Sequence, residues 1–541
     1  MSGALLQLAS LSSQDIFLTS NPEITLFKKT YLRYTNFSQE TVQVSFDAGS
    51  VQFGQETTAT LERTGDLISR IVLVIVLNQK TSISEWGYVD RVGHAIIDEI
   101  RIRVGQSDVD IQQNDWIDIY QRITKDKSQD ENYNKMIGNI PSLKKITTSH
   151  DGYRLYIPLE FWTGRNTSSA FPICSLINQQ FQISVKLRNA IDIINYYGVV
   201  PPTNEDLPVI STGYFLVDYI YLEKDELELF MNNNHDYLIE TVQDMTDTIL
   251  SSNSKVNLIF DKPTKYMLWH VNLDRYANRN EYMVWAYDNN WEKARNDFAK
   301  LVWLITRQGL DASDPNNPVI VFNDTFVNIG QVPPIIVGGN TMFEKLASKV
   351  DGIILFAQNI NGVITAKATI DNVVLTRNEI TFADMSTTNT EFKEDPNSTT
   401  EQLNFLNIHT LSIIDIFNYG NYINRTDNPI ISSSFQINGK NRFQERDGYF
   451  YNYIQSYYYL KNSPPDGVNF YTFALHPMEI QPSGTLNLGY VNSKDLILQL
   501  GQNNNINDTY FNTLFKSGQI RVLALCYNVI KIYRGVASLA Y

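Results

Sequence analysis

Apolar and polar residues alternate with a period of two along several stretches of the chain, as in β-strands that bury only one face. The stretches 100–104 and 181–187 show this most cleanly, with an apolar residue at every second position. Between Ile71 and Leu77 every residue is apolar and most are β-branched. Such a run is expected of a strand that is covered on both faces. The pattern predicts a protein built mainly from strands.

Further strand-like stretches follow along the chain, and clusters of Gly, Pro, Asn and Asp separate them. The stretches are Phe215–Leu222, Val256–Phe260, Val468–Leu475, Leu496–Leu500 and Ile520–Ile532. The turn clusters include residues 200–204, 314–318 and 463–467. Many strands joined by long polar loops are typical of β-sandwiches and jelly rolls. The sequence therefore predicts an all-β fold.

Helical periodicity is rare, and two segments show it. Between Trp291 and Gln308 apolar residues recur on one face at helical spacing, and Gly309 follows where a helix end favours glycine. A second, short and acidic helix is expected over Glu223–Asn232, directly after a predicted strand. We interpret this second helix as the start of a link between two halves of the chain.

A chain of 541 residues exceeds the usual size of one compact core, so we expect two domains. We assign residues 1–24 to an N-terminal arm, 25–225 to a first eight-stranded jelly roll and 226–250 to the link. Residues 251–541 are expected to form a second eight-stranded jelly roll, with a partly helical insertion at about 275–410. The halves share no repeat in sequence, so any duplication would be structural only.

The formal net charge of −14 restricts the expected partners. Nucleic-acid binding needs clustered cations, and the chain has only isolated pairs such as Lys28-Lys29 and Lys144-Lys145. We therefore expect no direct contact with nucleic acid. The longest apolar run, residues 71–77, is far shorter than the roughly 20 residues that cross a bilayer, so we expect no membrane span.

Sequence motifs for catalysis or cofactor binding are missing. The six histidines do not fall at metal-ligand spacing, and there is no C-x-x-C pair, nucleophile elbow or phosphate loop. We predict no catalytic, cofactor-binding or metal site, and no enzyme activity. Asp108 and Asp110 are interpreted as part of the solvated face of a strand. Cys174 and Cys526 lie in apolar surroundings and are interpreted as buried free thiols.

The segment Asn21–Phe37 combines a proline, aromatic residues and cations in a distinctive order. It begins Asn-Pro-Glu-Ile-Thr-Leu-Phe-Lys and ends Thr-Asn-Phe. It resembles the N-terminal signature of the major capsid proteins of nucleocytoplasmic large DNA viruses, which reads N-P-x-I-T-F-F-K/R and then an aromatic residue, an arginine and T-N-F. Leu26 stands where that family usually has phenylalanine.

Five further stretches resemble the same family, in the same order along the chain. They are Asn114–Tyr120, Lys265–Trp269, Phe435–Phe443, Phe470–Asn487 and Tyr527–Ala537. The clearest is Gln481–Asn487, where the family reads Q-P-S-G-T-x-N, although Leu488-Gly489 then replaces the usual F-S. Within the third stretch, Asn438-Gly439 is also a strong hairpin signal on its own.

The resemblance implies a double jelly-roll major capsid protein that forms homotrimers with a pseudo-hexagonal outline, because two similar rolls in three copies give six similar sides. It implies an icosahedral virion shell with contacts between neighbouring capsomers, and assembly in the host cytoplasm. We expect the insertion, including the polar loop Asp384–Gln402, on the outer surface. We expect the arm residues Ser2–Thr19 at the inner base, in contact with minor capsid proteins.

Two alternatives stay open at this point. One is a double jelly-roll assembly scaffold of the poxvirus type, which is shed when the particle matures. The other is a carbohydrate-binding or carbohydrate-active β-sandwich. The stretch Tyr449–Tyr459 would suit stacking against sugars or bases. Packing in the core and between subunits is the interpretation that we favour for these tyrosines.

Overall fold

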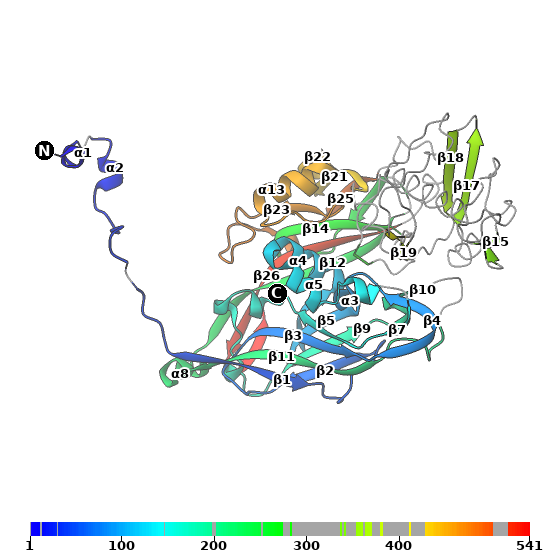
Figure 1. Cartoon of the computed structure of the whole chain (residues 1–541). Coiled ribbons are helices and arrows are strands. Elements are labelled where there is room, and N and C mark those ends of the chain that lie inside the picture. Colours follow the sequence, from blue (N-terminus) through cyan, green and yellow to red (C-terminus); the bar gives the residue numbers. More distant parts are fainter. Residues whose placement is uncertain are drawn as a thin grey trace.

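The computed structural model consists mainly of two β-sandwiches that lie side by side (Figure 1). The residues described are 2–273, 282–283, 428–500 and 518–540, apart from 11–12, 30, 145–146, 197–201, 250 and 252, together with paired strands between 336 and 412. The predicted helix Trp291–Gln308 and the loop Asp384–Gln402 lie outside the described residues.

The first sandwich contains two four-stranded sheets, with the strand orders β1-β11-β3-β8 and β2-β9-β5-β6. These strands are β1 Phe37–Ser45, β2 Glu56–Leu61, β3 Leu67–Leu77, β5 Ile97–Val104, β6 Ser107–Gln113, β8 Tyr153–Pro158, β9 Phe181–Leu187 and β11 Ile210–Leu222. A smaller sheet is formed by β4 Lys80–Tyr88, β7 Thr147–His150 and β10 Ile194–Tyr196. The strands predicted in this half are all present.

The second sandwich repeats this arrangement strand for strand, with the orders β12-β26-β14-β23 and β13-β25-β21-β22. These strands are β12 His235–Ile249, β13 Asn253–Asn257, β14 Pro263–Leu273, β21 Ile430–Ile437, β22 Lys440–Asp447, β23 Asn469–Thr472, β25 Lys494–Leu500 and β26 Gly518–Tyr533. The short strands β24 Leu486–Asn487 and β27 Val536–Leu539 pair with β14 and β26. The prediction of two eight-stranded jelly rolls is confirmed. In each roll the strands form two sheets that pack against each other, and the described strands form no closed barrel.

Two segments, the link and the arm, depart from the expected division of the chain. Most of the predicted link, residues 226–250, is the end of helix α8 and the strand β12, which pairs with β26 from His235↔Ile532 to Ile249↔Gly518. The predicted arm ended at residue 24, but the first strand begins only where Phe37 pairs with Leu222. The described strands within the expected insertion pair only with one another. They are β15 Ile336–Val337, β16 Asn340–Thr341, β17 Ile353–Ile360, β18 Val363–Ile370, β19 Glu379–Thr381 and β20 Thr410–Ser412.

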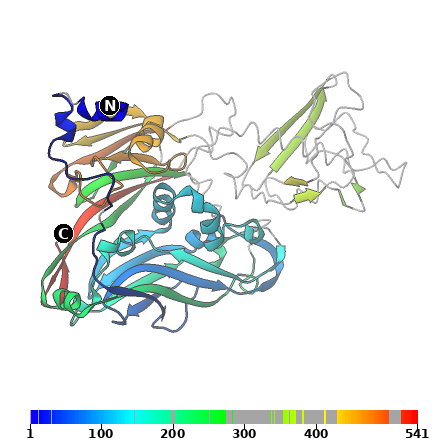
Figure 2. The same cartoon turned by 60° about the vertical axis from the view of Figure 1, so that its left-hand side comes forward.

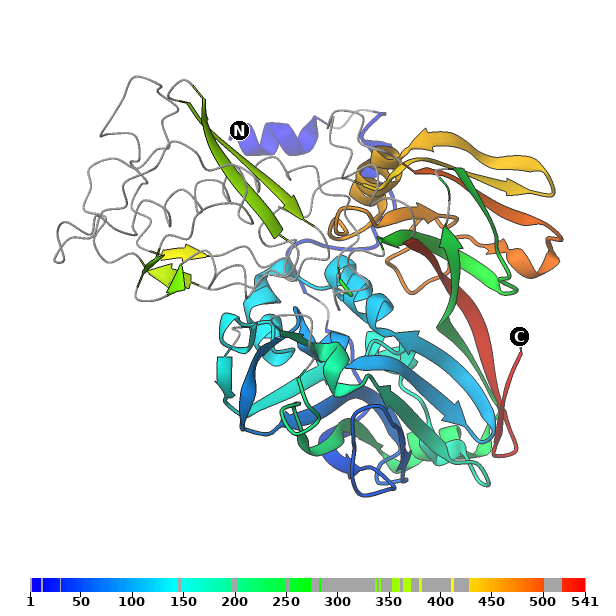
Figure 3. The same cartoon turned by 90° about the vertical axis from the view of Figure 1, so that its right-hand side faces the viewer.

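The structure contains more helix than the sequence predicted. The helices are α1 Gly3–Ala9, α2 Ile16–Thr19, α3 Val92–Ala95, α4 Asn114–Thr124, α5 Asp130–Met136, α6 Pro141–Lys144, α7 Trp162–Arg165, α8 Lys224–Asn232 and α13 Gln455–Tyr459. The predicted helix Glu223–Asn232 is confirmed as α8. Tyr449–Tyr459 forms a π-helical turn, Phe450–Ile454, that continues into α13. Figure 3 shows α4 and the neighbouring helices of the first half between the two sandwiches.

Two glycines in hairpin turns provide a matched test of local packing. Gly439 and Gly535 have φ angles of 75° and 79°, and each follows a residue that also has positive φ. A Cβ atom at Gly439 would meet nothing within 4 Å, whereas at Gly535 it would lie 2.3 Å from Ile177 Cγ1. We expect Gly439→Ala to lower the free energy of unfolding by about 1 kcal/mol through backbone strain, and Gly535→Ala by about 2–4 kcal/mol, because steric crowding is added. Chemical denaturation measures both losses, and equal losses would show that Ile177 moves aside without cost.

Candidate functional site

The polar clusters of the protein are structural in character. Among the described residues, no group of three or more His, Cys, Asp and Glu side chains is placed to hold a metal ion. No helix within the same residues is long and apolar enough to cross a membrane. The two cysteines are free; Cys526 is buried as predicted, whereas Cys174 is only partly buried. The densest buried polar groups lie at the junction between the two jelly rolls, which is therefore the candidate functional site.

The strands β12 and β26 connect the two rolls because they contribute side chains to the apolar cores of both. Their outer halves extend past the second roll and cover the first, so that Ile239, Ile530 and Ile532 belong to the same apolar cluster as the strands β3 and β11. Figure 2 shows the red strand β26 running down beside the first roll. The hairpin that follows is fixed by hydrogen bonds: the Gln179 side chain exchanges two with the backbone of Ala537, at 2.6 and 3.1 Å.

Helix α4 makes the reverse contribution, from the first roll to the core of the second. It belongs to the first roll, but Trp116, Ile119 and Ile123 are fully buried in the core of the second roll. Ile117, on another face of the helix, lies in the first core. The stretch Asn114–Tyr120 resembles the family in sequence, but no helix was predicted there. The spacing of 116, 119 and 123 along one helical face is the signal that would have predicted this helix.

A buried ion cluster lies beside α4. Asp115 Oδ2 is 2.9 Å from Arg521 Nη1 on β26 and 3.4 Å from His270 Nε2 on β14. Arg521 also contacts Asp244 Oδ2 on β12, at 2.7 Å. Burial on its own would raise the pKa of Asp115, but the charge of Arg521 and the hydrogen bond with His270 hold it well below its usual range. The carboxylate therefore stays ionised and binds the first roll to the second.

A second ion cluster is centred on Arg165, in α7. Its Nη1 atom lies 2.9 Å from Glu240 Oε2 on β12, and its guanidinium group donates two hydrogen bonds to the carbonyl oxygen of Glu160. The same guanidinium group stacks 4.5 Å from the ring centre of Tyr120. Glu240 also pairs with Lys265 on β14, at 2.5 Å. Buried charges are tolerated only when they are paired in this way, so the two clusters fix one geometry for the junction.

The interpretation of Asp110 as solvent-facing is wrong. The side chain is buried because β12 of the second roll packs over this part of β6. Its Oδ1 atom accepts a hydrogen bond of 2.8 Å from the backbone N–H of Val242, and Oδ2 accepts one of 2.8 Å from Gln112. Burial raises the pKa of Asp110 to about 6, although these hydrogen bonds and the charge of Arg165 oppose the shift. The alternation of the strand did not reveal that the second roll covers its polar face.

The raised pKa of Asp110 predicts a pH dependence of stability. A carboxyl group whose pKa is higher in the folded than in the unfolded state stabilises the fold at low pH, and this contribution is lost as pH rises through 6. Relative to Asp110→Asn, the native protein should gain about 2 kcal/mol in free energy of unfolding between pH 7 and pH 4, at about 1.4 kcal/mol per pKa unit. His94, whose pKa is lowered by burial, titrates in both proteins and cancels. Denaturation curves over this range measure the difference, and parallel pH profiles would contradict the prediction.

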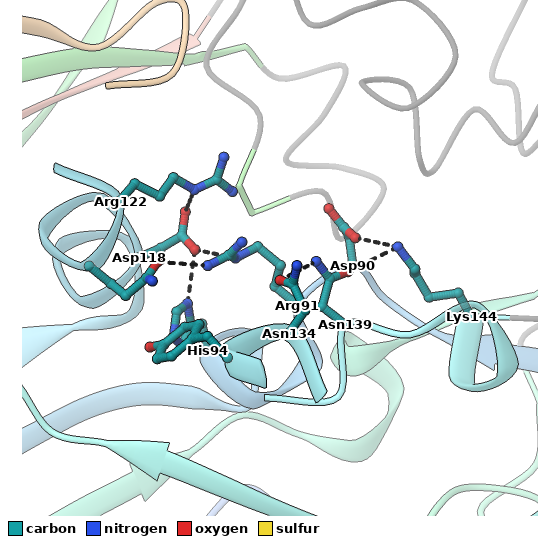
Figure 4. Close-up of polar contacts among 10 residues, drawn as sticks. Asp90, Arg91, His94, Asp118, Arg122, Asn134, Asn139 and Lys144 are labelled. Carbon is teal, nitrogen blue, oxygen red and sulfur yellow. Dashed lines mark hydrogen bonds and ion pairs between the residues drawn. The ribbon is translucent and has the colours of Figure 1, made fainter. Parts of the chain in front are cut away.

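A third cluster lies within the first roll (Figure 4). The Asp118 carboxylate contacts Arg91, His94 and Arg122, which together hold its pKa well below its usual range against the effect of burial. Because the carboxylate only accepts, His94 Nδ1 carries the proton and Nε2 accepts from Tyr133, at 2.8 Å. A hollow of about 230 Å³ separates these helices from the loop Ser463–Pro465 of the second roll. Both cations, Arg91 and Arg122, already face the carboxylate, and neutral His94 donates to it, which makes the cluster a structural element.

Comparison with known proteins follows the two halves of this architecture. Residues 25–223 match the family model of the major capsid protein N-terminus. Residues 226–538 match that of the large eukaryotic DNA virus major capsid protein. The chain belongs to the major capsid proteins of large eukaryotic DNA viruses. Capsid protein 1 of Acanthamoeba polyphaga mimivirus is 30% identical to this capsid protein, over the full length of both chains.

Other relatives of this capsid protein agree with the assignment. The major capsid protein of Phaeocystis pouchetii virus is 29% identical over the full length of both chains. In the quasi-atomic model of the PBCV-1 virus capsid, a chain with 22% identity matches the fold with a TM-score of 0.62, over 96% of this chain and 100% of that chain. The Faustovirus major capsid protein matches with a TM-score of 0.59 and 11% identity, over 97% and 96%. The resemblance, the double jelly-roll fold and the role as a structural protein of the virion capsid are thus confirmed.

The stretches that carried the resemblance lie in the framework of this capsid protein. Lys265–Trp269 is part of the buried strand β14, and Phe435–Phe443 spans the hairpin between β21 and β22. Asn438 and Gly439 form the turn of that hairpin, both with positive φ, as the Asn-Gly signal predicted. The signature Asn21–Phe37 is different, because all of it except Phe37 precedes the first strand and its described residues are exposed.

Proposed function

We propose that this capsid protein assembles into homotrimeric, pseudo-hexagonal capsomers of an icosahedral shell. The observation that carries the proposal is the matching strand order of the two jelly rolls. Two similar rolls give each copy two similar sides, and threefold rotation of the copy gives six. Such a unit would fit a hexagonal lattice through contacts with neighbouring capsomers.

The buried junction supports this function, because a shell unit has to keep the angle between its two rolls. The ion pairs of Asp115 and Arg165 and the crossing strands β12 and β26 join the rolls in one continuous structure. A hinge between the rolls would let the six sides of the trimer move independently. We therefore infer that the junction acts as the rigid centre of the capsomer, and that no enzyme activity is needed for this role.

The remaining placements are part of the same proposal. The arm residues Ser2–Thr19 would lie at the inner base and bind minor capsid proteins, and the insertion at about 275–410 would face outwards. The acidic net charge supports a shell without direct contact to the genome. Assembly would take place in the host cytoplasm. We also propose the division into residues 25–225 and 251–541, with β12 added to the second part, and the matching strand orders of the two sets of sheets support it.

Solution mass tests the proposal most directly. We expect the purified chain to be a stable trimer that forms hexagonal sheets, and we expect it to be retained in mature particles. A monomer that binds or hydrolyses glycans would overturn the proposal, and loss of the protein on maturation would indicate a scaffold. Antibody labelling of a tag in the loop Asp384–Gln402 on intact shells tests the outward placement. Deletion of Ser2–Thr19 tests the contact with minor capsid proteins, and unchanged assembly would contradict it.

A further inference from the structure

The segment before the first strand carries apolar side chains that its own copy leaves uncovered. We call residues 21–36 the binding segment. Its large apolar side chains, among them Leu26, Phe27 and Leu32, are between 77% and 98% exposed. An exposed apolar group of this size marks a surface that a partner covers. The segment also holds the cations Lys28, Lys29 and Arg33 against the single carboxylate of Glu23, within a chain that is acidic overall.

A matching surface lies at the end of the molecule where this segment leaves the fold. We call it the basal patch, and its apolar side chains are between 46% and 65% exposed. It consists of Ile177, Leu229, Met231, Tyr533 and Val536. These residues come from three elements that are joined by hydrogen bonds. Ser175 Oγ donates to the carbonyl oxygen of Phe230 in α8, at 2.7 Å, and the Ile177 N–H donates to Gly535 in the last hairpin, at 2.9 Å. Figure 2 shows α8 beside the outer end of β26.

The rim of the basal patch is acidic, whereas the binding segment is basic overall. Glu223, Asp225 and Glu228 are exposed on α8 and directly before it. Lys224 is the one cation in the helix, and its Nζ atom lies 3.9 Å from Glu228 Oε1. An apolar surface with an acidic rim complements an apolar segment that carries three cations.

We propose that the binding segment of one copy binds the basal patch of the neighbouring copy in the trimer. The binding segment leads directly into Phe37, the first residue of β1. Phe37 pairs with Leu222, which lies two positions before α8 begins. Figure 1 shows the arm extending away from the body of its own copy. Its 16 residues span up to about 50 Å when extended, at roughly 3.3 Å per residue, so a neighbouring copy is within reach. Three head-to-tail contacts close into a ring, and each copy then gives one arm and receives one. This inference rests on the proposed trimer.

Zero-length crosslinking of the full-length protein tests the contact. Isotopically light and heavy chains are mixed, assembled and treated with a carbodiimide, which joins lysine amines to carboxylates that they touch. We expect Lys28 or Lys29 to be linked to Asp225 or Glu228. About half of the linked pairs should combine a light with a heavy peptide, because the two copies are drawn independently from an equal mixture.

A charge exchange gives a second readout. The substitutions Lys28→Glu and Lys29→Glu together should lower the trimer fraction about tenfold at low salt, because like charges then face each other. Adding Asp225→Lys and Glu228→Lys should restore it, whereas the control Lys135→Glu on α5 should leave it unchanged. Sedimentation measures the trimer fraction.

The outcomes separate this inference from the proposed function. Trimers whose links never mix isotopes would show that each arm binds its own copy, and would overturn the inference alone. Trimers without these links would also overturn it, since another partner then covers the arm. A chain that stays monomeric would overturn the proposed function and this inference together.

Discussion

Arg521→Met should lower the free energy of unfolding by about 3–5 kcal/mol, because it leaves a buried carboxylate without its counter-charge. Asp115 is almost fully buried, and Arg521 is the cation that faces it at 2.9 Å. The same arginine holds Asp244 on β12, so the substitution removes both the ion pair between α4 and β26 and the one between β26 and β12. Chemical denaturation of the purified protein and of the variant measures the loss.

The design includes a rescue and a control. Asp115→Asn in the Arg521→Met background should recover part of the loss, since a neutral amide needs no counter-charge. Lys135→Met removes the partner of Glu131 from an exposed ion pair on α5, and should have little effect. A loss for Arg521→Met as small as that for Lys135→Met would show that the junction does not depend on this ion cluster.

Trp269→Ala should also cost about 3–5 kcal/mol, because it opens a cavity in the centre of the second roll. Trp269 on β14 is fully buried, with its ring centre 5.1 Å from that of Tyr451 and 6.3 Å from that of Phe443. Its Nε1–H donates to Ser433 Oγ at 3.3 Å, and this hydroxyl group loses its donor in the variant. Thermal and chemical unfolding measure the effect.

A matched aromatic residue controls for the loss of surface area alone. Tyr457 lies in α13 of the same roll and is 79% exposed, so Tyr457→Ala should change the free energy of unfolding by less than about 0.5 kcal/mol. Similar losses for the two variants would contradict the central position that the structure gives to Trp269. If Tyr457 serves as a contact between copies, its substitution should change the trimer fraction instead of the stability of the single chain.

The strands and turns could be predicted from the sequence because their signals are local. The alternation at 181–187 and the apolar run at 71–77 correspond to β9 and β3, and Asn438-Gly439 forms the expected turn. The boundaries were less accurate where a strand depends on a distant partner. Residues 235–249 are a strand because β26, almost 300 residues later, pairs with all of them.

The junction could not be predicted for the same reason. Asp110 and Asp115 are ordinary polar residues until β12 and Arg521 come to lie over them. Their burial is a property of how the two rolls pack, which neither period-two alternation nor motif spacing encodes. Helix α4 was not predicted either, but its signal is local. Trp116, Ile119 and Ile123 have the spacing of one helical face in the sequence itself.

The path of β26 and its hairpin has a consequence for the timing of synthesis. Ile530, Ile532 and Ala537 complete the apolar core of the first roll, yet they follow strand β11 of that roll by about 300 residues. A nascent first roll therefore exposes part of its core until β26 and β27 have been synthesised, and its non-local contacts form last. Chains truncated before β26 lack this closing strand, so neither roll can present the complete surface from which a shell is built.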